Sequence, residues 1–368
     1  MLRNTLFILL LFISTLTLHA QSAEDALSEF DWLTEFVRKN YPGYENKTKG
    51  HKKELKRWIN RQRAVITLQP DTVPFVMDEY IRRFNDGHLS LGLTKQGRSF
   101  FHDTIERATK RMKQNTQPQS TNMYFTAKAM NDSTFFLRIP SFGDPMSNKI
   151  VEDNREAIAA RPYLIIDLRC NGGGNDNNFN SLMSFVYSKP YQTHGVELYA
   201  TPDFLALYRK TAKEVEDEDA KKWFNTMADS VEQHLGGYVL RPGMKRINLC
   251  SRDTVYPNPR KVGILIHGRN ASSAEQFILE AMESDKVVLF GNENTMGAID
   301  LSNVFSIPTP KGWFELCIPT TRSCRCPDII IDGIGISPQI SVPYEESLQE
   351  KDRIGEEIEY IEKVLRRG

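Results

Sequence analysis

The chain has no excess charge of either sign and contains little cysteine. Its 47 Lys and Arg residues are balanced by 47 Asp and Glu residues, so no net charge favours nucleic acid or an anionic membrane as a partner. The five cysteines cannot all pair, and Cys324 and Cys326 stand too close in sequence to bond each other easily. No histidine lies near them at a zinc-binding spacing. We therefore expect no nucleic-acid partner, no metal and no cofactor.

Long apolar runs are also scarce, and the one at the N-terminus is short. Residues 6–18 are almost wholly apolar or hydroxylated, with Arg3 before them and the small residue Ala20 after them. A run of this length suits a secretory signal better than a membrane span. We predict a signal peptide over residues 1–20, export to the periplasm or the extracellular space, and no stable membrane insertion after cleavage. An uncleaved membrane anchor is the alternative, whereas the lack of a following cysteine argues against a lipid anchor.

The spacing of apolar residues predicts the domain organisation. The N-terminal part has helical spacing interrupted by turn residues. A later part alternates between strand and helix patterns, which indicates an α/β core. We predict an N-terminal helical domain over residues 21–93, a connecting helix and strand segment over 94–134, a core over 135–345 and a C-terminal helix over 346–368. The core includes a strand at Glu315–Ile318. It is interrupted by an insertion over 189–258, which contains one charged helix from Thr211 to Asp229.

Two segments could carry chemistry, and each begins where an apolar run ends. Ser272 follows the run 262–266 and precedes a predicted helix, where free N–H groups could stabilise an oxyanion. The run 164–168 leads into the glycines at 172–174, a loop of backbone donors. A helix N-cap is the alternative role for Ser272. A phosphate-binding loop is the alternative for the glycines, although the spacing typical of nucleotide sites is missing.

A serine nucleophile needs a group that removes its proton. His88 stands apart from the other histidines because it follows Asp86 and Gly87 at a helix-to-strand junction. Loops at such junctions often deliver functional side chains. The residues alone leave a purely structural role for His88 open.

Together these segments resemble the tail-specific, or C-terminal-processing, serine peptidase family. The resemblance rests on four sequences, which are DLRCNGGG at 167–174, SSAE at 272–275, GNENTMG at 291–297 and GIGISP at 333–338. It implies an α/β fold with a crotonase-like ββα core, an N-terminal helical domain and an inserted cap.

The resemblance also implies roles for individual residues. The family's nucleophile lies three residues before the motif glutamate, Glu275, which is the position of Ser272. The oxyanion donors would be the backbone N–H groups of Ser273 and of Gly172 or Gly173. Asp167 and Arg169 would hold the glycine loop in place.

The base departs from the commonest family pattern. The bacterial processing peptidases carry a lysine directly after the downstream glycine, but Ala298 follows Gly297, and Lys286 does not match that place. A second branch, similar to the tricorn core peptidase and the retinoid-binding-protein-like repeats, uses a histidine in an Asp-Gly-His setting and an acid near the closing motif. That branch implies a triad of Ser272, His88 and Asp332. The other candidate acids are Asp328, Asp300 and Glu283.

We therefore predict an exported serine peptidase that hydrolyses peptide or protein substrates through an acyl-enzyme. The alternative is a non-catalytic protein that binds peptides or hydrophobic ligands on the same scaffold. Acyl transfer on a thioester is a third possibility, supported only by the shared core.

Overall fold

The structure, a computed structural model, describes residues 22–106, 124–343 and 350–367. The chain forms two compact units, each made of three separate stretches. The first comprises Met1–Pro118, Leu198–Val239 and Asn303–Arg322, and the second comprises Gln119–Glu197, Leu240–Ser302 and Ser323–Gly368. The predicted signal peptide at 1–20 lies outside the described residues, as do residues 107–123 of the predicted connection.

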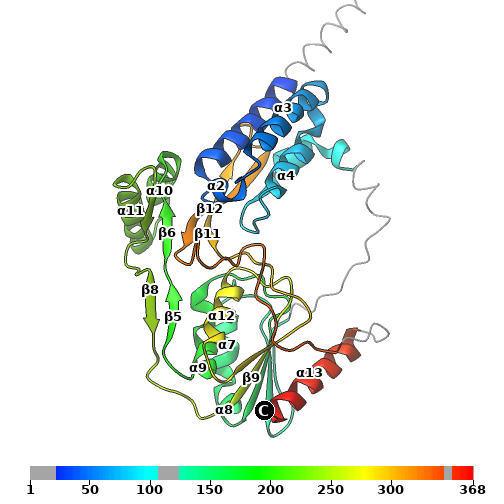
Figure 1. The fold of residues 1–368 in the computed structure, drawn as a ribbon, viewed down its shortest axis with the longest axis vertical. Helices are drawn as coiled ribbons and strands as arrows, with labels where there is room; N and C mark the ends of the chain where they lie inside the picture. The colour runs from blue at the N-terminus through cyan, green and yellow to red at the C-terminus, as the bar shows by residue number, and fades with distance from the viewer. Residues whose placement is uncertain (1–21, 107–123, 344–349, 368) are drawn as a thin grey trace, which may run out of the picture. The chain divides into compact units, whose positions relative to one another are not determined.

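The N-terminal part of the first unit is helical where apolar spacing predicts helices (Figure 1). A helix over residues 22–40 buries Phe30, Leu33 and Val37 completely. The ring centroid of Phe30 lies 6.3 Å from the rings of Trp58 and Tyr80, which come from the two following long helices. The labelled helices of this part are α2 (Tyr44–Lys47), α3 (Lys52–Leu68), the short 3₁₀ helix η1 (Pro70–Thr72), α4 (Val73–Arg82) and α5 (Lys95–Phe100).

A five-stranded sheet lies mostly in the first unit. Its order is β1 (Ser90–Leu93), β12 (Phe314–Ser323), β6 (Val196–Tyr199) and β7 (Tyr238–Leu240), with β11 (Leu301–Pro308) also paired to β12. β1 and β12 are antiparallel, with Leu91 opposite Leu316. The prediction that assigned Glu315–Ile318 to the α/β core was therefore wrong. A strand's own residues specify its faces, but they do not specify its partner.

Two helices, not one, occupy the charged part of the predicted insertion. α10 (Pro202–Glu214) ends before Val215, which is extended, and α11 (Glu218–Glu232) begins after Asp217. The Asp217 carboxylate accepts the Ala220 N–H at 2.7 Å, so it caps the second helix. The prediction of a single helix from Thr211 to Asp229 was wrong because this cap starts a new helix inside the charged run.

The second unit contains the alternating α/β pattern. Its sheet has the order β10 (Val287–Phe290), β9 (Lys261–Leu265), β4 (Tyr163–Asp167), β3 (Thr134–Arg138) and β2 (Thr126–Ala129). β10, β9, β4 and β3 are parallel, and only β2 is antiparallel. Asp167 lies opposite Leu265 and Arg138 in this register. The carboxyl ends of these strands therefore meet at one edge of the sheet. A separate two-stranded ribbon pairs β5 (Tyr191–His194) with β8 (Ile247–Cys250).

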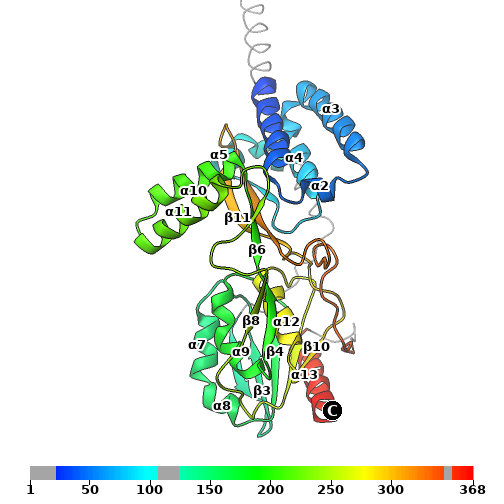
Figure 2. The same ribbon diagram turned by 60° about the vertical axis from the view of Figure 1, so that its left-hand side comes forward.

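Helices cover both faces of this sheet (Figures 1 and 2). Residues such as Leu164 and Ile166 join a core with the helices on one face, whereas Ile165 joins a core with the helix on the other. This alternation is the two-residue period of a strand buried on both sides. The first face carries α7 (Met146–Asp153), α8 (Arg155–Ala159), α9 (Asn180–Val186) and α12 (Ser273–Met282), and the second carries α13 (Glu350–Arg367).

The C-terminal helix α13 lies close to β9 because Gly263 has no side chain there. A Cβ at Gly263 would stand 2.9 Å from Ile361 Cγ2. Ile361 is completely buried, and Ile358 and Leu365 lie nearly buried beside it. The apolar stripe predicted for the C-terminal segment is thus the face that α13 packs on the sheet. Within the described residues, no helix combines the length and the apolar character needed to cross a bilayer.

Replacing Ile361 by Ala tests this packing. We expect Ile361→Ala to lower the free energy of unfolding by about 2–5 kcal/mol, since it leaves a cavity between α13 and the sheet. Chemical denaturation measures the loss, and Lys363→Ala on the exposed side of α13 is the control. Equal stability of the two variants would contradict the packing.

Candidate active site

Three loops that carry the family-like motifs leave the same edge of the second unit's sheet. β4 leads into the glycines at 172–174, β9 leads into the segment 266–272 that ends at Ser272, and β10 leads into 291–297. Ligands of parallel α/β sheets bind at the carboxyl ends of the strands. The topology therefore gathers these motifs where such a site is expected.

Ser272 has a backbone conformation that is rare for a residue with a side chain. Its φ is 55° and its ψ is −127°, and it directly precedes α12. Such conformations cost about 1–3 kcal/mol and persist only where surrounding contacts hold them. The Ser272 hydroxyl makes no capping hydrogen bond to the helix. The alternative interpretation, in which Ser272 is an N-cap through its side chain, therefore does not describe this residue.

A chain of hydrogen bonds holds Ser272 in this conformation. The Ser272 N–H donates to Ala298 O at 2.8 Å. The completely buried carboxylate of Glu275 accepts the N–H groups of Gly297 and Ala298 at 2.8 Å and the hydroxyl of Thr295. Burial raises the pKa of Glu275, and the bonds from Thr295, Ala298 and Gly297 only partly offset this rise. Glu275 thus fixes the loop that in turn fixes Ser272.

The glycine loop touches the serine loop at Gly173. Its φ is +104°, and a Cβ there would stand 2.7 Å from Ala271 O, 2.8 Å from Ser272 Cβ and 3.0 Å from Ser273 N. Only glycine allows both this conformation and this approach. The structure therefore brings together Gly173, Ser272 and Ser273, three of the residues that the resemblance placed in one site.

The backbone donors of the glycine loop are not equivalent. The Gly173 N–H donates to Asn171 Oδ1 at 2.9 Å, so it is already used. Gly172 is exposed, and among the described residues the structure gives its N–H no acceptor. Gly172 is therefore the better placed of the two predicted donors.

Asp167 and Arg169 form an ion-pair network directly before the glycine loop in the chain. Asp167 is buried, and its carboxylate accepts from Arg138 Nε at 2.9 Å and from Arg169 Nε at 3.0 Å. Burial by itself would raise the pKa of Asp167, but the two guanidinium groups outweigh it and hold the pKa below its ordinary value. Arg169 also pairs with Glu357 of α13. These ion pairs therefore join β3, β4 and α13.

Asp332 lies in a reciprocal clasp with Asp300. The Asp332 carboxylate accepts the N–H groups of Ile299 and Asp300 at 2.7 Å through Oδ1, and that of Leu301 at 3.2 Å through Oδ2. The Asp300 carboxylate accepts the N–H groups of Ile331 at 2.6 Å and Asp332 at 2.8 Å. Arg325 pairs with Asp300 at 3.3 Å. Both carboxylates therefore help to join two segments of the second unit.

His88 lies in the first unit, in a loop that Asp86 orders. The Asp86 carboxylate accepts the His88 N–H at 2.8 Å and the hydroxyl of Tyr41 at 2.6 Å. The Nδ1 atom of His88 is buried, and among the described residues it has no hydrogen-bond partner. Buried polar atoms are normally paired, so an unpaired one calls for an explanation.

The remaining candidates from the sequence lie in other surroundings. Asp328 and Glu283 are exposed. Lys286 stands at the amino end of β10, the opposite end of the sheet from the Ser272 loop, and its Nζ donates to Tyr256 O at 2.7 Å. It is therefore not a base for Ser272.

One acid beside the serine loop was not predicted from the sequence. Asp176 begins the 3₁₀ helix η2 (Asp176–Phe179) after the glycines, and its carboxylate is hydrogen-bonded to the side chain of Ser273. Desolvation raises the pKa of Asp176, while Ser273 and Arg241 oppose the rise. Its place directly after a glycine loop was the available signal.

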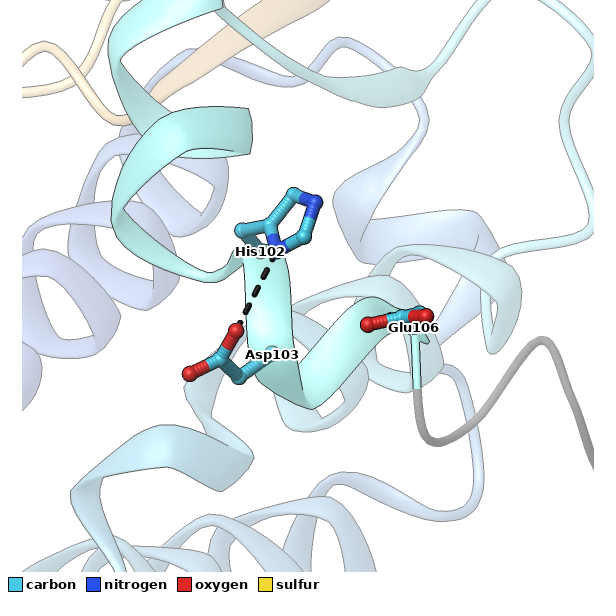
Figure 3. Close-up of side chains that lie close together, drawn as sticks. All are labelled: His102, Asp103 and Glu106. Atoms are coloured by element: carbon cyan, nitrogen blue, oxygen red, sulfur yellow. Dashed lines mark hydrogen bonds and ion pairs between the residues drawn. The ribbon is translucent and has the colours of Figure 1, made fainter.

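Figure 3 shows His102, Asp103 and Glu106, a group whose ligand atoms lie within 4.8 Å of one another. All three side chains are exposed and come from the single helical stretch at 102–106. His102 Nδ1 lies 3.1 Å from Asp103 Oδ1. Exposed groups of this kind are common without an ion, so we assign no metal site to them.

The chain is similar to a known peptidase family in sequence and to solved structures in fold. The family model of peptidase family S41 matches residues 134–342. The structure of mature CPAF complexed with lactacystin is similar to this chain, with a TM-score of 0.62 and 14% identity over 94% of this chain and 98% of that one. A protein of Parabacteroides merdae ATCC 43184, described as a candidate peptidase, gives 0.59 and 14% over 92% and 96%. At this identity the likeness shows a shared α/β fold.

The contact at Gly173 generates a paired prediction. We expect Gly173→Ala to slow the labelling of Ser272 by a fluorophosphonate about 100-fold, because the new Cβ displaces the serine loop. Gly172→Ala should label at nearly the wild-type rate, since its Cβ would stand 3.9 Å from the nearest atom, Arg269 O. Labelling rates on purified protein measure both effects. Similar rates for the two variants would contradict the proposed contact.

Proposed function

The chain belongs to peptidase family S41 and is a serine-type peptidase, and on that premise we propose that Ser272 is the nucleophile that forms an acyl-enzyme with a peptide or protein substrate. The observation that carries the proposal is the backbone of Ser272. A conformation at φ 55°, with a hydroxyl that makes no capping bond to α12, is costly for a structural serine. The hydroxyl stands at the start of a helix, where free N–H groups can stabilise an oxyanion.

We propose that the Gly172 and Ser273 N–H groups stabilise the oxyanion. Both belong to segments that meet at Gly173, and the first turn of α12 adds the positive end of its dipole. Removing one such donor from a serine peptidase typically costs about 10²–10³ in kcat. The absence of a lysine after Gly297 leaves the proton of Ser272 to another base.

His88 is the base in this proposal, and Asp332 is the acid that orients it. Ser272 Oγ attacks the carbonyl carbon while His88 takes the hydroxyl proton. His88 then returns that proton to the leaving amine, and the C–N bond breaks to give the acyl-enzyme. Water, deprotonated by His88, then attacks the acyl carbon. The ester bond from that carbon to Ser272 Oγ breaks, His88 returns the proton to Oγ, and the carboxylic acid product leaves. The Nδ1 of His88, which has no hydrogen-bond partner in the part of the chain that the structure describes, supports a role beyond packing.

We further propose that the second unit has a crotonase-like core, that the N-terminal helices form a helical domain within the first unit, and that residues 189–258 form an inserted cap. The parallel strands β3, β4, β9 and β10, with helices between them, support the core. The N-terminal apolar run supports export of the protein to the periplasm or the extracellular space.

A fluorophosphonate probe tests the nucleophile and the base. We expect the wild type to be labelled, Ser272→Ala to be unlabelled, and His88→Ala to be labelled about 10²–10⁴ times more slowly, since it loses proton removal. His102→Ala, an exposed histidine in the same unit, is the matched control and should label normally. Protein that is unlabelled, or labelled equally in all variants, would instead support a non-catalytic binding protein.

A variant of Asp300 is the control for Asp332, the proposed acid. Asp332→Asn and Asp300→Asn each weaken the same joint, so both should lower the melting temperature. Only Asp332→Asn should also reduce kcat strongly, up to about 10⁴-fold, if its carboxylate orients His88. A fluorogenic peptide cleaved by the wild type provides kcat. Equal kcat for the two variants would reduce Asp332 to a purely structural role.

A further inference from the structure

We propose that Asn270 is a positioning residue for acyl transfer, because it fixes the peptide plane between Asn171 and Gly172 and thereby the direction of the Gly172 N–H. The inference rests on the proposed function, since it presupposes that this N–H stabilises the oxyanion formed when Ser272 attacks. Asn270 would act through the backbone of the glycine loop, without touching substrate.

Asn270 uses every polar atom it has. Its side chain is completely buried, and its Nδ2 donates to Leu168 O at 2.5 Å and to Asn171 O at 2.9 Å. Its Oδ1 accepts the His267 N–H at 2.7 Å. Its backbone N–H donates to His267 O at 2.9 Å, and its carbonyl accepts the Met296 N–H at 2.8 Å. One residue thus joins the three loops that leave β4, β9 and β10.

The bond to Asn171 O sets the orientation of a donor. The peptide unit is planar and almost always trans, so its C=O and N–H point in opposite directions. When Asn270 holds the Asn171 carbonyl, the Gly172 N–H of the same unit must point the other way. The loop therefore cannot turn this N–H without breaking a buried hydrogen bond.

Asn171 extends this control to the next peptide unit. Its Oδ1 accepts the Gly173 N–H at 2.9 Å, and its Nδ2 donates to Ile139 O at 3.2 Å. The Gly173 N–H is used in this bond, which leaves Gly172 as the available one of the two predicted donors. Because Gly173 packs against Ser272, the nucleophile and the donor are held as one assembly.

An asparagine suits this position better than other residues. Two carbonyl acceptors and one N–H donor surround a buried side chain, and only a primary amide offers two donors and an acceptor together. Aspartate would present oxygen to two carbonyl oxygens, and an apolar residue would leave Asn171 O without this donor. Either change removes the constraint on the peptide plane.

The test compares Asn270→Ala and Asn270→Asp with Ile158→Ala, a completely buried residue of α8 outside the three loops. The readouts are kcat and KM for a fluorogenic peptide that the wild type cleaves, and the affinity of a boronic acid of the same peptide sequence, which forms an anionic tetrahedral adduct with serine. Both Asn270 variants should lose about 100-fold in kcat and in boronate affinity, with little change in KM. Ile158→Ala should lower the melting temperature and leave kcat, KM and boronate affinity unchanged.

The outcomes separate this inference from the function on which it rests. Asn270→Asp preserves volume and provides the measurement if the alanine variant does not fold. A folded Asn270 variant with wild-type kcat and boronate affinity would overturn the positioning role and leave the peptidase intact. A wild type without Ser272-dependent turnover would overturn both.

Discussion

The geometry around Ser272 depends on the hydrogen bonds that the buried carboxylate of Glu275 accepts. Moving a carboxylate out of water costs several kcal/mol unless donors replace its hydration, and Thr295, Gly297 and Ala298 supply those donors. The loop fixed in this way offers the Ala298 carbonyl to the Ser272 N–H. A serine conformation that an isolated chain would rarely adopt is therefore maintained by an acid that lies one helical turn further on.

The same physical device recurs along the carboxyl edge of the sheet. Asp167 anchors the glycine loop through two guanidinium groups, and Asp300 and Asp332 join two later segments through backbone N–H groups. Loops leave many backbone N–H groups without a helix or strand partner, so a buried carboxylate that gathers several of these donors is an effective way to order them. The same buried carboxylates thus stabilise these loops and hold the residues proposed for catalysis.

Local sequence patterns predicted the helices and strands whose signal lies within their own residues. The runs at 163–168 and 262–266 contain most of β4 and β9, because buried parallel strands are largely apolar. The motif SSAE predicts Ser272 as the nucleophile. The pairing of β12 with β1 was missed because it joins distant segments. The break at Val215 was missed because a cap within a charged run has little periodic signal. The strained φ of Ser272 and the burial of Glu275 depend on three loops meeting, which no single segment encodes.

The division of the chain into interleaved stretches affects how such a protein can change over time. Each unit draws on three separate parts of the sequence, so a single crossover in the gene cannot exchange one unit for another without splitting a core. Neither unit could be passed on as an independent module, and the two must be inherited together.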